Sequence, residues 1–207
     1  MSRIKKAGLL ILLILIADQV FKIWVKTHMV EGESFPVLGN WFLISFTENE
    51  GAAFGWLVGG KTGKLLLSIF RIILAGAIAW YLPRLSKRRD ISTGFLIALA
   101  GILAGAIGNI IDSMFYGMIF TDSVGRVAEM FPAEGGYAPF LFGHVVDMLF
   151  FPIWEGTFPD WFPVWGGEDF LFFRFIFNIA DSAVCVSIIY IFFFERKSLS
   201  KVLGHNK

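Results

Sequence analysis

The segment Phe177-Asn178-Ile179-Ala180-Asp181-Ser182 places an amide and a carboxylic acid inside an apolar run, residues 170–194, that has the length and composition of a membrane span. Placing an acid at bilayer depth costs roughly 2.5 kcal/mol or more. We therefore expect Asp181 to face protein or a water-filled cavity, and we expect another part of the chain to supply its partner.

The composition predicts a small polytopic membrane protein. Hydrophobic residues make up 56% of the 207 positions, which is more than a soluble domain carries. The formal net charge of +1 argues against a nucleic-acid partner. Because Cys185 is the lone cysteine, no internal disulfide can form.

Four apolar runs predict an all-α membrane protein, a single domain over residues 1–207 with a small extramembrane β element and a long outer loop. Transmembrane helices are expected at the four runs, residues 7–25, 65–82, 93–114 and 170–194. The first run is too long for a cleaved signal peptide and lacks a small-residue cleavage site, so we expect it to be retained.

Basic residues gather at both termini and in the short loop after residue 82. The positive-inside rule therefore places these three segments in the cytoplasm. The two remaining loops, residues 28–63 and 120–169, are then expected outside.

Two of the expected spans carry polar pairs. Asp18 and Lys22 are four positions apart and share a helix face, where they can form an ion pair. A purely structural pair and a direct functional role are equally open. Asn109 and Asp112 also share a face, and here a structural polar clamp is somewhat favoured over direct chemistry. Small residues on the same span are spaced for close helix packing: Gly101, Gly105 and Gly108.

The outer loops contain three distinctive stretches. Residues 41–46 predict a strand. Residues 49–55 combine an amide, glycines and small residues, which suits a backbone close to a ligand, although a plain tight turn is the simpler alternative. Trp154, Trp161 and Trp165 alternate with prolines and indicate a segment at the membrane interface.

The polar groups support one chemistry better than others. His28, His144 and His205 lack the spacing of paired metal ligands, so we expect no metal and no cofactor. Cys185 and the serines lack a paired base. Two neighbouring carboxylates remain, of which one keeps a proton while the other acts as a base, as in aspartic proteases.

Five segments give the chain a resemblance to the bacterial lipoprotein signal peptidase (signal peptidase II) family, whose motifs they match in order. They are Asp18-Gln19-Val20-Phe21-Lys22, Asn49-Glu50-Gly51-Ala52-Ala53-Phe54, Gly108-Asn109-Ile110-Ile111-Asp112, Val145-Val146-Asp147 and Phe177-Asn178-Ile179-Ala180-Asp181. The matches extend over most of the chain.

The resemblance implies an aspartic endopeptidase of the bacterial inner membrane with Asp147 and Asp181 as its catalytic dyad, toward the periplasmic face. Its substrate would be a prolipoprotein, cut before a cysteine that carries diacylglyceryl, and globomycin-like cyclic peptides would inhibit it. Other motif positions would support the site: Asp18, Lys22, Asn49, Gly51, Asn109, Asp112, Asn178 and Ala180.

The chain departs from the family pattern in two ways. Ser113 stands where the family usually has Arg after its G-N-x-x-D motif, and Arg174 or Arg126 is a candidate substitute. Residues 152–169 form a Trp- and Pro-rich insertion, and the segment before His144 is also long. We expect both extensions on the outer leaflet as part of a lid over the substrate.

Two other classes of protein compete with the peptidase. A small transporter or channel would use Asp18, Asp112 and Asp181 to relay protons or bind cations, but it does not explain residues 49–55. A structural membrane subunit would explain the glycines and aromatic residues, but it leaves the acids without a role.

Overall fold

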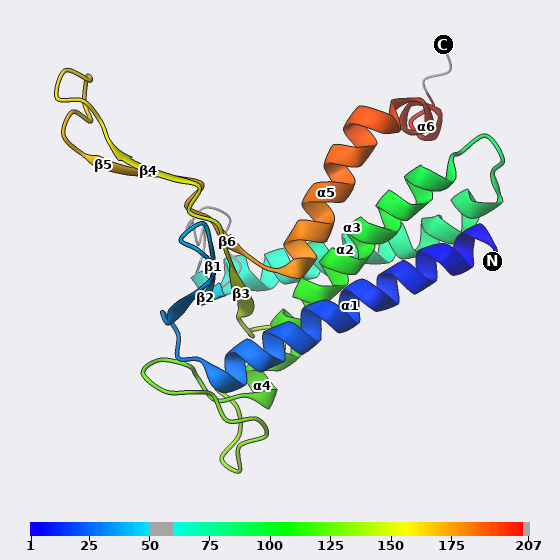
Figure 1. Cartoon of the computed structure of the whole chain (residues 1–207). Coiled ribbons are helices and arrows are strands. Elements are labelled where there is room, and N and C mark those ends of the chain that lie inside the picture. The colour runs from blue at the N-terminus through cyan, green and yellow to red at the C-terminus, as the bar shows by residue number, and fades with distance from the viewer. Residues whose placement is uncertain (50–59, 205–207) are drawn as a thin grey trace.

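The computed structural model describes residues 1–49 and 60–204. Within these ranges, three helical segments are long and apolar enough to cross a membrane (Figure 1). The first two belong to α1 (Arg3–His28) and α2 (Gly60–Lys87). The third runs through α3 (Thr93–Ile111), a π-helical turn η2 (Asp112–Tyr116) and the short α4 (Gly117–Ile119). These segments cover the first three expected spans.

The fourth expected span, residues 170–194, is helical only in its second part, α5 (Ile179–Phe194), which a short α6 (Arg196–Val202) follows. Asn178 has an extended backbone and its side chain accepts a hydrogen bond from the Asp181 amide at 2.8 Å, so it is the N-cap at which the helix begins. The aromatic residues before it favour strands as readily as membrane helices. Because the 16 residues of α5 fall short of a full span, the described residues contain three to four apolar helices of a membrane protein, and a fourth full span is not confirmed.

Helix α3 lies at the centre of the bundle, between α1 and α5 (Figure 1). Half of the residues in the most apolar stretch of Thr93–Ile119, the segment that α3 begins, are buried inside the protein. The corresponding share is 17% for the apolar stretches of α1 and α2. Glycine makes this close packing possible, because a Cβ on Gly105 would lie 2.2 Å from the carbonyl oxygen of Ala180. The close packing of α3 on α5 confirms the helix contact that the glycine spacing predicted.

An antiparallel sheet sits at the end of the bundle opposite the termini (Figure 1). Its strand order is β1 (Ser34–Leu38), β2 (Phe42–Asn49), β3 (Val145–Phe150) and β6 (Ile176–Phe177). Strand β2 confirms the strand predicted at residues 41–46. The register pairs Thr47 with Asp147 and Leu149 with Phe177, so β3 lies between Asn49 and the start of α5.

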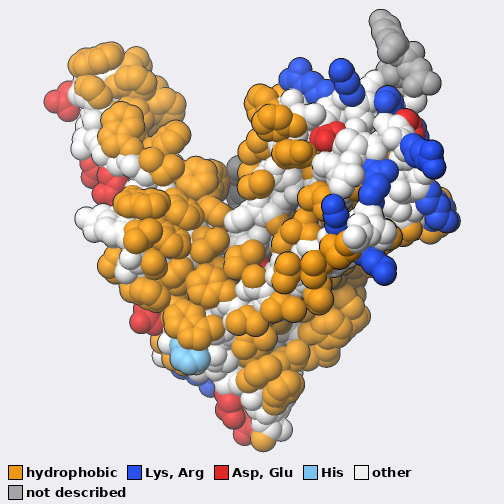
Figure 2. Space-filling view, turned by 45° about the vertical axis from the view of Figure 1, so that its right-hand side comes forward, with side chains coloured by type: hydrophobic (Ala, Val, Ile, Leu, Met, Phe, Trp, Pro, Cys, Tyr) orange, Lys and Arg blue, Asp and Glu red, His pale blue; other side chains and the backbone are white. Residues whose placement is uncertain are grey.

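A second sheet consists of β4 (Trp154–Thr157) and β5 (Asp169–Phe172), which pair as a hairpin. We call residues 154–172 the aromatic arm. The expected outer loop, residues 120–169, therefore contains regular strands. Figures 1 and 2 show the arm projecting away from the sheet and the helices. It does not fold over the start of α5, so the expected lid is not observed.

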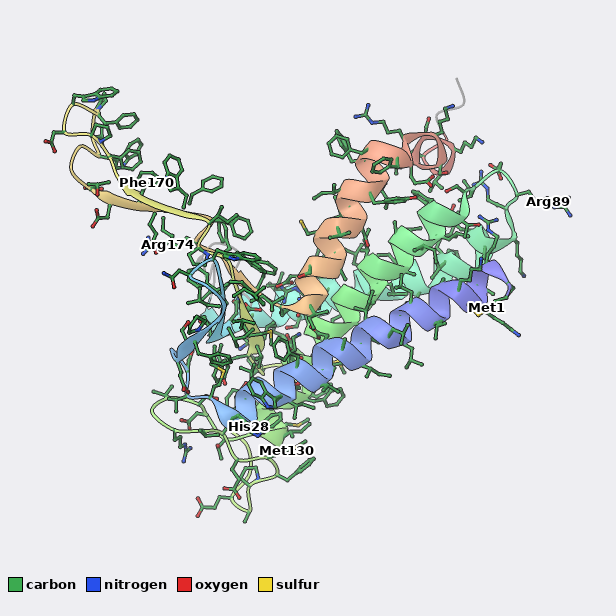
Figure 3. All side chains as sticks on the ribbon, in the orientation of Figure 1. Met1, His28, Arg89, Met130, Phe170 and Arg174 are labelled. Carbon is green, nitrogen blue, oxygen red and sulfur yellow. The ribbon has the colours of Figure 1, made fainter. Side chains whose placement is uncertain are left out.

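The two ends of the bundle differ in charge. Met1 and Arg89 lie at one end, and His28 and Met130 lie at the other (Figure 3). Lys and Arg side chains gather at the end that carries the termini, as Figure 2 shows. The bundle is therefore electrostatically polarised along its axis.

Candidate active site

A buried ion-pair triad lies between α1 and η2. The Lys22 Nζ atom is 2.9 Å from Asp18 Oδ2 and 2.7 Å from Asp112 Oδ2, and all three side chains are fully buried. The four-residue spacing of Asp18 and Lys22 correctly predicted their pairing. One cation and two acids leave the triad with a formal surplus of negative charge, which further donors must stabilise.

Backbone and amide donors complete the triad and tie it to the other elements. Asp18 Oδ1 accepts a hydrogen bond from the Ala180 amide at 2.9 Å, and Asp112 Oδ2 accepts one from the Val146 amide at 3.3 Å. Gln19, which we did not single out from the sequence, donates to Asp18 at 3.1 Å and to Asp112 at 3.0 Å. The triad thus fixes the start of α5 and strand β3 against α1.

Two amides carry this network to two further acids. Asn109 accepts a hydrogen bond from Lys22 at 2.9 Å and donates to Asp181 Oδ1 at 2.7 Å. Asn178 donates to Asp147 Oδ1 at 2.7 Å and to Asn109 Oδ1 at 3.1 Å. Asp147 on β3 and Asp181 on α5 are therefore held by two side-chain amides that contact each other.

The environment of Asp147 favours its protonated form. Burial and the nearby charge of Asp181 raise the pKa of Asp147 to about 7. A hydrogen bond from Asn49 at 3.2 Å, the charge of Lys22 and the bond from Asn178 act in the opposite direction without cancelling the increase. Near neutral pH this carboxyl group can hold or release a proton, as a general acid or base must.

Most of the residues singled out from the sequence meet in this network: Asp18, Lys22, Asn49, Asn109, Asp112, Asp147, Asn178, Ala180 and Asp181. Gly51 lies outside the described residues. Ser113, at the family arginine position, donates a hydrogen bond to the Asn109 carbonyl at 3.0 Å.

The candidate substitutes for that arginine lie at the surface. Arg126 forms an exposed ion pair with Asp122, and Arg174 is exposed on the chain that leaves the aromatic arm. Instead, half-buried Arg71 on α2 interacts electrostatically with Asp181 and Asp147. Sequence reasoning missed Arg71, although an arginine within an apolar span is itself a signal of function.

A second polar cluster, around Glu48, joins the neighbouring elements. Glu48 on β2 pairs with Lys26 of α1, accepts a hydrogen bond from Ser123 at 2.6 Å and lies 3.2 Å from His144 Nδ1. Burial alone would raise the pKa of Glu48, but the bond with His144 and the charge of Lys26 outweigh it and lower the pKa to about 2. The cluster locks the strands that carry Asn49 and Asp147 onto α1.

The first prediction concerns Glu48, whose lowered pKa makes its ionised form stabilising. This contribution is fully present above the unfolded pKa, near 4.5, and is lost as the pH falls toward 2. At pH 7, Glu48→Gln should lower the free energy of unfolding by on the order of 3 kcal/mol. Thermal unfolding in detergent measures the loss. Glu33→Gln is the matched control because Glu33 is exposed, and an equal loss in both variants would contradict the prediction.

No group of three or more His, Cys, Asp or Glu side chains in residues 1–49 and 60–204 is arranged to hold a metal ion.

Comparison with known proteins shows a relationship along nearly the whole chain. The chain is 47% identical over 203 residues to the lipoprotein signal peptidase of Porphyromonas gingivalis, covering 98% of this chain and 88% of that protein. It is 36% identical over 192 residues to that of Amoebophilus asiaticus, covering 92% of this chain and 77% of the relative. A solved bacterial membrane enzyme superposes with a TM-score of 0.60 at 26% identity, covering 97% of this chain and 93% of that one.

The profile of the signal peptidase (SPase) II family matches residues 10–195, which include the ion-pair triad, both amides and both acids of the site. The chain belongs to the lipoprotein signal peptidase family, membrane proteases that act on the signal peptides of lipoproteins.

Proposed function

We propose that this protein is an aspartic endopeptidase that cuts prolipoproteins immediately before a diacylglyceryl-modified cysteine, with Asp147 and Asp181 as its catalytic dyad. The observation that carries the proposal is that each acid accepts a hydrogen bond from a side-chain amide, and that the two amides are themselves hydrogen-bonded. Asn178 binds Asp147, Asn109 binds Asp181, and the two amides are joined at 3.1 Å. Such an arrangement suits two carboxyl groups that share one proton.

In the proposed reaction the ionised acid of the dyad removes a proton from water, which attacks the scissile carbonyl carbon. The protonated acid donates its proton to the carbonyl oxygen. The tetrahedral gem-diol then collapses: the newly protonated acid gives its proton to the leaving amine, and one hydroxyl of the intermediate returns its proton to the other carboxylate, so the dyad again holds one proton. The dyad titrates as a unit, so neither acid is assigned a fixed role.

We assign the basic end of the bundle, with both termini, to the cytoplasm, and the sheet end to the periplasmic face of the inner membrane. The gathering of Lys and Arg around the termini supports this orientation (Figure 2). The start of α5, at Asn178, then lies near the outer surface, where a lipid-anchored cysteine can reach it. A globomycin-like cyclic peptide would inhibit by placing its hydroxyl group between Asp147 and Asp181.

The test is incubation of the purified protein with a prolipoprotein that carries diacylglyceryl on its cysteine, with the unmodified precursor as control. Mass spectrometry should find the lipid-modified precursor cut before the cysteine and the unmodified one largely intact. Ion flux in proteoliposomes without cleavage would favour a transporter, and neither activity would favour a structural subunit.

The second prediction is a loss of cleavage above neutral pH. The raised pKa of Asp147, about 7, means that the dyad loses its shared proton as the pH rises through that value. Activity on the lipid-modified substrate should therefore fall between about pH 7 and pH 9 while the protein remains folded. A rate that is flat across this range, with folding checked by circular dichroism, would contradict the shared-proton mechanism.

The third prediction assigns to Arg71 the cationic role of the family arginine. Arg71→Met should reduce kcat/KM by about 10-fold to 100-fold, because a removed charge of this kind commonly contributes 1–3 kcal/mol. Arg71→Lys should restore part of the loss. Arg126→Met and Arg174→Met are matched controls at exposed positions, and a loss as large in either control would count against Arg71.

A further inference from the structure

We propose that the aromatic arm, residues 154–172, binds the outer leaflet of the membrane through one of its two faces. The inference requires that the chain be a membrane protein, but it does not depend on the proposed peptidase chemistry. It assigns a lipid surface as the partner of an insertion that lies between the two acids in sequence and outside the site in space.

The register of the hairpin separates two faces. Directly paired residues of an antiparallel ribbon share a face, and successive residues alternate between faces. One face therefore carries the pair Trp154 and Phe172 and the pair Gly156 and Phe170. The other carries the pair Glu155 and Leu171 and the pair Thr157 and Asp169, and Thr157 donates to Asp169 at 2.8 Å. The arm is thus an amphipathic ribbon.

The aromatic face continues into the turn of the arm. The Phe170 ring lies 5.3 Å from Trp154 and 4.7 Å from Phe158, and Phe158 lies 5.0 Å from Phe162. These contacts leave Phe158, Phe162 and Phe170 only half-buried. Trp154 remains 64% exposed, and Phe172 remains 59% exposed. A two-stranded hairpin with such exposure would be at best marginally stable in water, so an apolar environment must cover this face.

The position of the arm favours lipid as that environment. Figure 2 shows hydrophobic side chains along the arm, across a gap from the apolar surface of α5, and acidic side chains on the arm's outer edge. The outward surface of α5 carries exposed apolar residues that suit contact with acyl chains, among them Val186, Ile189 and Phe193. The arm's apolar side chains therefore lie across a gap from a helix surface whose composition suits contact with acyl chains.

The chemistry of the rings fits the same location. Trp combines a large apolar ring with one polar N–H group, and it concentrates at the boundary between headgroups and acyl chains. The arm joins the bundle just before Asn178, where the apolar helix α5 begins. An arm at this level would lie along the membrane surface, with its acidic face toward water.

The experiment compares two labelled sites at the same height of the arm. Cys185, the lone cysteine, is replaced by Ala. An NBD fluorophore is then attached to Phe172→Cys on the aromatic face or to Glu155→Cys on the acidic face. Each protein is placed in nanodiscs of phosphatidylethanolamine and phosphatidylcholine, loaded with one copy per disc, with or without 5-doxyl phosphatidylcholine.

The Phe172 site should lose most of its fluorescence to the doxyl lipid and resist aqueous iodide, whereas the Glu155 site should show the opposite pattern. An Asp181→Asn background should give the same result, which separates this inference from the peptidase proposal. Iodide quenching of both sites alike would overturn the inference, and so would a shielded Phe172 site that the doxyl lipid does not quench. The latter result would indicate a protein partner.

Discussion

The variants Asp147→Asn and Asp181→Asn should each lose cleavage of the lipid-modified precursor by ~10⁴-fold. Each replacement removes one of the two groups that must exchange protons, while the side chain keeps its shape. The Asn oxygen can still accept the hydrogen bond that Asn178 donates to Asp147, or the one that Asn109 donates to Asp181. The loss is therefore expected in the chemical step, with substrate affinity nearly unchanged.

A measurement of thermal stability distinguishes the loss of a catalytic group from simple unfolding of the variant. The pKa of Asp147 is raised in the folded protein, so its ionisation costs stability as the pH rises from about 3.8 to about 7. Asp147→Asn removes this cost and should raise the thermal midpoint at pH 8 more than at pH 5. A variant that loses cleavage and also melts earlier at pH 8 would contradict the assignment.

The double variant provides a second check. If the two acids act as one unit, Asp147→Asn combined with Asp181→Asn should be no less active than either single variant. Asp122→Asn is the matched control, because this acid lies in an exposed ion pair. Additive losses in the double variant would indicate two independent roles and would rule out a dyad.

The sequence predicted contacts that follow from helix geometry. Asp18 and Lys22 pair because four residues bring them onto one face, and the separation of Asn109 from Asp112 likewise places both in the network of Lys22. The resemblance to the family motifs added Asp147 and Asn178 to the expected site. These residues lie far apart in the chain, and Asn178 donates a hydrogen bond to Asp147 at 2.7 Å.

Other features could not be predicted because they depend on strand register or on a single local contact. The aromatic residues before Asn178 resemble a membrane helix in composition, and only the cap formed by Asn178 shows where α5 begins. The cluster around Glu48 joins Lys26, Ser123 and His144, and no spacing pattern connects these positions. Arg71 was detectable in principle, but its electrostatic interaction with Asp147 and Asp181 was not.

The largest effect on folding is expected at Lys22. Lys22→Met would leave Asp18 and Asp112 buried with no cation between them, and breaking a buried ion pair in this way costs about 3–5 kcal/mol. The damage should spread to the site, because Lys22 also donates to Asn109, which holds Asp181. Unfolding in detergent with increasing sodium dodecyl sulfate measures the stability of the variant.

A charge-free triad distinguishes the cost of unpaired charge from the loss of packing. In the variant that combines Asp18→Asn, Lys22→Met and Asp112→Asn, no charge remains in the triad, so most of the stability should return. Activity should stay low, because Asn109 no longer receives the donor that orients it toward Asp181. Arg126→Met, which breaks an exposed pair, should leave the stability almost unchanged. A Lys22→Met variant no less stable than Arg126→Met would show that the triad does not hold the fold together. Full activity of the charge-free variant would show that the triad does not orient the dyad.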